Sequence, residues 1–67
     1  MENRMKLLRR ERGWSQSELA ARVGVSRNSI ISIENGRFDP SLPLAFDLAA
    51  AFDMKIEDIF QHKPKSD

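Results

Sequence analysis

The central stretch of the chain, QSELAARVGVSRNSIISIEN, runs from Gln16 to Asn35 and carries its strongest structural signal. Two helices joined by a short turn can cross closely only if the first offers a small side chain at the crossing, where Ala20 lies. Gly24 can adopt the left-handed conformation that reverses the chain. Apolar residues that would lock the second helix across the first recur at helical spacing: Leu19, Val23, Val25, Ile30 and Ile33. This combination predicts a helix-turn-helix rather than a generic helical hairpin.

Capping residues predict where the two helices of this motif begin. Ser15 and Glu18 fit a capping box, in which the hydroxyl and the carboxylate each satisfy a free backbone N–H at the helix start. Ser26 can cap the second helix, which we expect from about Arg27 to Asn35. The first helix of the motif is therefore expected to start at the Ser15 cap and to end at Gly24.

Three more helices are expected outside the motif. Helix-favouring residues over 4–12 precede Gly13, which lets the chain turn. Ser41 can cap a helix that continues to Phe52 with apolar residues at helical spacing, and a short helix follows over 56–60. With no strand pattern between these segments, the fold class is all-α with five helices.

The length of 67 residues allows one small domain, which we expect to span residues 1–67 and to end in a fraying polar tail at 61–67. Without cysteine there is no disulfide or thiol nucleophile, and a lone histidine cannot build a typical transition-metal site. No apolar run approaches the roughly 20 residues of a membrane helix, and the charged start does not resemble a signal peptide. A soluble cytoplasmic protein without metal or cofactor is the expectation.

The formal net charge of +1 hides an uneven distribution of charge. Residues 1–37 hold eight Lys or Arg against four Asp or Glu, a net of +4, whereas residues 38–67 hold three against six, a net of −3. This asymmetry indicates that the first half meets a polyanion such as nucleic acid. A merely solvated basic face is the alternative interpretation.

Four short motifs closely resemble the Xre/Cro-repressor type of helix-turn-helix domain: Gln16-Ser17-Glu18-Leu19-Ala20, Val23-Gly24-Val25-Ser26-Arg27, Ile33-Glu34-Asn35-Gly36 and Pro40-Ser41-Leu42. The resemblance covers about Met5 to Phe60 and implies a compact lambda-repressor-like domain that acts as a homodimeric transcriptional regulator. Minimal members of this family also pair short terminal segments as an antiparallel ribbon. Residues 3–4 and 60–62 are available for one here, although the sequence does not require it.

A helix in the major groove presents residues of its N-terminal part to base edges. Here Arg27 can make bidentate hydrogen bonds to guanine or bind a phosphate, and Asn28 can make them to adenine. Ser32, one turn further along, is a third candidate for contact with a base or the DNA backbone. Ile31 faces away from the core, either to contact a thymine methyl or as an isolated exposed residue. If this helix does not enter the major groove, Arg27, Asn28 and Ser32 are simply solvated polar side chains. The full candidate set for DNA contact is Gln16, Ser26, Arg27, Asn28, Ser29, Ile31, Ser32, Asn35 and Arg37.

Other roles follow from the resemblance and from the turn after the second helix. The resemblance implies that Gln16 touches the DNA backbone and braces the groove-reading residues, although it is also a good helix former. It further implies a partly buried structural ion pair between Arg9 and Glu34. Around the Gly36 turn, a backbone N–H and the side chain of Arg37 are expected to meet phosphate, with Asn35 beside them.

The remaining basic and aromatic residues of the first half receive structural or peripheral roles. We expect Arg10 and Arg12 to lie on a solvated face. Trp14 is expected to cover the corner between the first two helices, and Phe38 to pack under the loop before the fourth.

One recognition helix reads only a few base pairs, so specificity generally needs two copies on a two-fold operator with half-sites about 34–36 Å apart or a multiple of this. The acidic second half supplies apolar residues for such a homodimer interface, although each could instead belong to the core: Phe46, Met54, Ile56 and Phe60. The favoured function is therefore a sequence-specific regulator of transcription, most simply a repressor.

Two other classes of function compete with this interpretation. An antitoxin or other protein-interaction module would use the helix-turn-helix to hold a partner protein. An enzyme is disfavoured because Glu57 and Asp58 are adjacent, His62 has no evident orienting partner and no Gly-rich phosphate loop is present. Nothing in the sequence indicates a small-molecule ligand.

Overall fold

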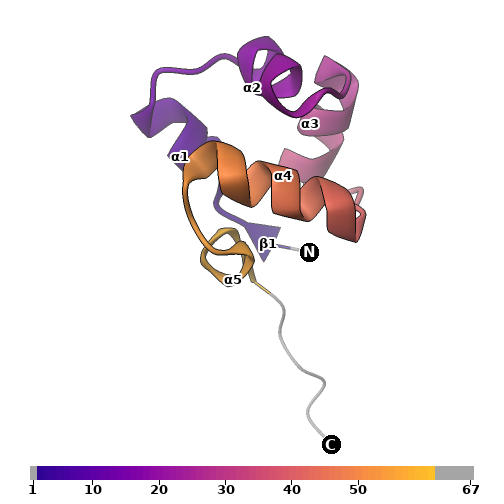
Figure 1. Ribbon diagram of the computed structural model, residues 1–67. Helices are drawn as coiled ribbons and strands as arrows, with labels where there is room; N and C mark the ends of the chain where they lie inside the picture. The colour runs from indigo at the N-terminus through magenta and orange to yellow at the C-terminus, as the bar shows by residue number, and fades with distance from the viewer. Residues whose placement is uncertain (1, 62–67) are drawn as a thin grey trace, which may run out of the picture.

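The computed structural model describes residues 2–61 and consists of five helices and a two-stranded ribbon (Figure 1). In chain order the elements are β1 (Glu2–Asn3), α1 (Met5–Glu11), α2 (Gln16–Val23), α3 (Arg27–Glu34), α4 (Leu42–Phe52), α5 (Ile56–Ile59) and β2 (Phe60–Gln61). The expected five-helix domain with a terminal ribbon is confirmed. Residues 62–67, which belong to the expected polar tail, lie outside the described residues.

Serine caps begin three of the helices at the expected positions. The hydroxyl of Ser15 accepts from Glu18 N at 3.0 Å, that of Ser26 from Ser29 N at 3.2 Å, and that of Ser41 from Leu44 N at 3.3 Å. The reciprocal half of the capping box is not formed among the described residues; the Glu18 carboxylate accepts from the Arg22 guanidinium at 3.4 Å.

The turn between α2 and α3 depends on Gly24. Its φ of 73° lies in the left-handed region, which a glycine adopts without steric cost, and its N–H donates to Ala20 O. This conformation ends α2 and lets α3 start within three residues. Ala20 is 3% exposed, as expected for a small side chain where two helices cross.

The core is a single cluster to which every helix contributes. It packs α2 against α3 and α4, while α5 closes the end of α4. The buried members are Met5, Leu8, Leu19, Ala20, Ile30, Ile33, Ala45, Leu48, Ala49, Phe52, Ile59 and Phe60. Because the inner face of α3 is anchored in this cluster, its opposite face is free to point outward.

Arg12 is exposed, as expected, and it has a structural role in addition. Its guanidinium donates to Leu8 O at 3.1 Å and to Phe52 O at 2.7 Å, so it satisfies carbonyls at the C-terminal ends of α1 and α4. It also lies 5.8 Å and 5.1 Å from the ring centroids of Trp14 and Phe52, which stack at 5.6 Å. Trp14 thus covers the corner between α1 and α2.

The ribbon pairs Glu2 with Gln61 and Asn3 with Phe60 in antiparallel register. It differs from the expected segments by starting one residue earlier, because Arg4 follows the strand and donates its N–H to Ile59 O at 2.8 Å. The fifth helix accordingly ends before Phe60, and Gln61 is a strand residue rather than the start of the polar tail. His62, the last residue of the expected ribbon, lies outside the described residues.

Candidate nucleic-acid interface

The outer face of α3 carries the residues that the sequence proposes for reading bases. The Asn28 side chain is exposed and Ser32, one turn further along, is half-buried, while Ile30 and Ile33 on the opposite face are buried. Among the described residues, the Asn28 side chain makes no hydrogen bond, so its amide is available to an external partner. Ile31 is half-buried, so it is neither a core residue nor fully exposed.

Gln16 links the start of α3 to its end. The Gln16 side-chain oxygen accepts from Arg27 Nη2 at 3.3 Å, and its amide nitrogen donates to Glu34 Oε1 at 3.2 Å. One side chain on α2 thereby holds the first and the last residue of α3. The orientation of the Arg27 guanidinium depends on this contact.

Arg9 and Glu34 form an ion pair with almost no exposure to solvent. Arg9 Nε donates to Glu34 Oε2 at 2.8 Å and Arg9 Nη2 to Glu34 Oε1 at 3.3 Å, in a two-pronged arrangement. The two side chains are 10% and 1% exposed, respectively. A third bond, from Arg9 Nη1 to Trp14 O at 2.8 Å, uses another guanidinium nitrogen. The pair therefore connects α1 to the end of α3 and to the turn before α2.

The hydroxyl groups of Ser26 and Ser29 are engaged with each other at the N-terminus of α3. Their Oγ atoms lie 3.0 Å apart, in addition to the cap bond from Ser29 N. These two candidates for DNA contact thus already serve the helix cap.

The turn after α3 differs from its expected arrangement. The backbone N–H groups of Asn35, Gly36 and Arg37 donate to Ile31 O, Ile33 O and Ser32 O, each at 3.0 Å. Because these donors close the helix end, the expectation of a backbone N–H for phosphate is wrong at these three residues. The exposed side chains of Asn35 and Arg37 are the groups left to make such contacts.

Phe38 does not pack under the following loop as expected. It is 50% exposed and lines an open hollow of about 260 Å³ together with Asn28, Ser29 and Ser32. The reversal of the chain at Gly36, whose φ is 75°, brings the loop back beside α3. An apolar ring therefore adjoins the outer face of α3.

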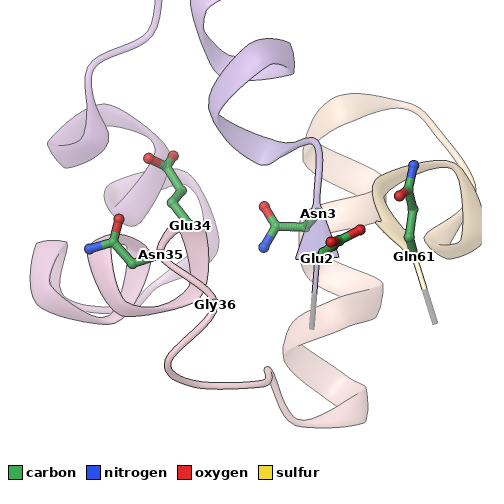
Figure 2. A pocket seen from close by; sticks show the side chains of 6 residues that line it. All are labelled: Glu2, Asn3, Glu34, Asn35, Gly36 and Gln61. Carbon is green, nitrogen blue, oxygen red and sulfur yellow. The ribbon is translucent and has the colours of Figure 1, made fainter. Parts of the chain in front are cut away.

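Sequence reasoning missed the role of Asn3. Its Nδ2 donates to Ile33 O at 2.8 Å and its Oδ1 accepts from Met5 N at 3.1 Å, so one amide ties the ribbon to α1 and to the C-terminal end of α3. Figure 2 shows Asn3 and Glu34 beside the notch between α3 and the ribbon, which measures about 490 Å³. An asparagine near a chain end gives no sequence signal for such a contact.

The candidates for a dimer interface separate into two groups. Phe60 is 7% exposed and belongs to the core of its own chain, and it pairs with Asn3 in the ribbon, so it can offer a partner only a small edge. Met54 and Ile56 are half-buried against the same core. Phe46 on α4 is 58% exposed, and Leu42, one turn earlier and not in the expected set, is 65% exposed.

Neither a metal centre nor a membrane segment is found in the described part of the chain. Residues 2–61 contain no group of three or more acidic, histidine or cysteine side chains placed to hold a metal ion. No helix within that range is long and apolar enough to cross a membrane.

A helix-turn-helix with an outward, polar second helix defines a DNA-binding domain. The model of the helix-turn-helix family matches residues 5–59 of the chain. The uncharacterized HTH-type transcriptional regulator MJ0272 of Methanocaldococcus jannaschii is 52% identical over 60 residues, which cover 90% of this chain and 91% of that protein. Antitoxin HipB of Escherichia coli O6:H1 is 35% identical over 81% of this chain and 57% of its own length.

Solved structures agree with this assignment. The restriction-modification controller protein C.AhdI from Aeromonas hydrophila superposes with a TM-score of 0.78 at 33% identity, covering 85% of this chain and 86% of that one. SinR, a master regulator for biofilm formation solved in complex with DNA, superposes with a TM-score of 0.72 at 36% identity, covering 81% of this chain and 87% of that one. The chain belongs to the Xre-type helix-turn-helix family and is a transcriptional regulator with a DNA-binding domain.

Removing one partner of the Arg9–Glu34 pair should destabilise the fold more than replacing both. Glu34→Ala leaves a buried guanidinium unpaired and is expected to lower the free energy of unfolding by about 3–5 kcal/mol. The double variant Arg9→Met/Glu34→Leu should show a clearly smaller decrease in the free energy of unfolding, because no unpaired buried charge remains. Urea denaturation followed by circular dichroism measures both.

The exposed Glu18–Arg22 pair supplies the control. Its side chains are each 47% exposed, so Glu18→Ala should change the free energy of unfolding by about 0.5 kcal/mol or less. A double variant at positions 9 and 34 that is less stable than Glu34→Ala would contradict the assignment of a desolvated pair.

Proposed function

We propose that this chain is a cytoplasmic repressor that binds a two-fold DNA operator as a homodimer, with α3 in the major groove. The observation that carries the proposal is the outer face of α3, where the free amide of Asn28 and the hydroxyl of Ser32 lie side by side, one turn apart. An α-helix fits the major groove, and short polar side chains at its N-terminal part reach base edges there.

Five of the nine candidate side chains then have proposed contacts with DNA. Asn28 pairs with an adenine edge and Ser32 contacts an adjacent base or phosphate. Arg27, oriented by Gln16, contacts guanine or the nearest phosphate. Arg37 and Asn35 contact the backbone where α3 ends, and the positive charge of residues 1–37 favours approach to the duplex.

The homodimer is supported by the apolar surface at the start of α4. Leu42 and Phe46 are exposed there, and an apolar groove of about 240 Å³ adjoins them between α4 and α5, lined by Pro40, Leu42, Ala45, Ile56 and Phe60. Covering this surface with a second copy removes two large apolar side chains from water in each subunit. Operator occupancy by such a dimer blocks transcription when the site overlaps a promoter.

The antitoxin interpretation has one observation in its favour, which is the similarity to HipB. It predicts that the chain is recovered from cells in a stoichiometric complex with another protein and that DNA selection yields no preferred site. Selection of bound sites from random duplexes therefore separates the two functions and reports operator sequence, symmetry and half-site spacing together.

Asn28 and Arg37 should behave differently toward the selected operator. Asn28→Ala should reduce discrimination at one base position of each half-site by about 1–3 kcal/mol, because a bidentate base contact is lost. Arg37→Ala should weaken binding to all sequences alike and lower the slope of log affinity against log salt by about one unit. Fluorescence anisotropy with cognate and random duplexes measures both, and equal losses on the two duplexes for Asn28→Ala would refute base reading.

Phe46→Glu should weaken the dimer at least about tenfold, because it introduces a charge into an apolar contact. Sedimentation equilibrium at micromolar concentration measures the effect. Leu7→Glu is the matched control, since Leu7 on α1 is a similarly exposed apolar residue, at 52%. A wild-type protein that stays monomeric with and without DNA would contradict the dimer.

A further inference from the structure

We propose that Phe38 is a specificity-determining residue that contacts the 5-methyl group of a thymine beside the base pair read by Asn28. The contact forms in the hollow that Phe38 lines with Asn28, Ser29 and Ser32. The inference deepens the proposed function and rests on it, because it names one base that the outer face of α3 recognises.

Phe38 is a large apolar side chain that lies outside the core, beside the outer face of α3. Half of the side chain is exposed, and it is not among the hydrophobic residues packed against the core. The ring instead adjoins α3 on the face that carries Asn28 and Ser32, opposite the buried Ile30 and Ile33. A large apolar side chain next to polar side chains in one hollow suits a ligand that presents both polar and apolar groups.

The major-groove edge of an A·T pair is such a ligand. Adenine offers the donor and acceptor that an asparagine amide matches, and thymine offers a methyl group that projects into the groove and is contacted by apolar side chains. Asn28 supplies the amide and Phe38 supplies the apolar surface, within one hollow. Neighbouring A·T pairs therefore satisfy both side chains, whereas cytosine presents no methyl group to the ring.

The net positive charge of the residues adjacent in sequence to those lining the hollow favours DNA over a second protein copy. Arg27 and Arg37 directly precede Asn28 and Phe38 in the sequence, and Asp39 follows Phe38; all three are exposed, so two positive charges stand against one negative charge. Two copies joined through this face would bring like charges together, whereas the phosphates on either side of the groove neutralise them. The apolar surface of Leu42 and Phe46 is a separate patch on α4.

Replacing thymine by uracil in the selected operator tests the contact, because it deletes only the methyl group. For the wild-type chain, uracil at one thymine of each half-site should weaken binding about fourfold, the value of one buried methyl-sized group. Phe38→Ala should weaken binding to the thymine operator by a similar factor and abolish the difference between thymine and uracil. Phe38→Leu should keep part of the difference.

Leu7→Ala is the matched control, since it removes an equally exposed apolar side chain from α1 and should keep the full uracil effect. Phe38→Ala should retain its helical circular dichroism and its sedimentation behaviour. Persistence of the uracil effect in Phe38→Ala, or an equal loss of affinity for operator and random duplexes, would overturn the inference and leave the proposed function standing. A change in oligomeric state would assign Phe38 to a protein contact instead, and failure to select any duplex would overturn both.

Discussion

The structure depends on one buried carboxylate. Glu34, at the end of α3, accepts from the Arg9 guanidinium on α1 and from the Gln16 amide on α2, and Gln16 in turn holds Arg27. A carboxylate that is 1% exposed is tolerated only when it is paired and hydrogen-bonded, so these contacts favour the observed position of α3 against α1 and α2. The geometry of the outer face follows from this constraint.

Around this centre, a very small fold supports α3 at both ends. Ser26 caps its start, while Asn3 from the ribbon and the Gly36 turn satisfy carbonyls at its end. Such polar ties are needed because a domain of this size buries only a modest apolar core. With its ends fixed, the helix can present its outer side chains with little loss of conformational freedom on binding.

Local chemistry explains why the sequence predicted the helices well. Caps at Ser15, Ser26 and Ser41 and the glycine turns act within a few residues, so their effects can be read from short motifs. The contacts that were missed join distant parts of the chain: Arg12 to Phe52, and Asn3 to Ile33. For the interface, the sequence could nominate the outer face of α3 but could not indicate that Phe38 is half-exposed beside it.

The most direct test of the account is the pattern of intermolecular nuclear Overhauser effects between the chain and its selected duplex. The account predicts contacts from Asn28 and Ser32 to major-groove protons, with the Arg9 and Gln16 side chains keeping their partners. Contacts to DNA that arise only from α4 or α5, with the outer face of α3 left in solvent, would contradict it.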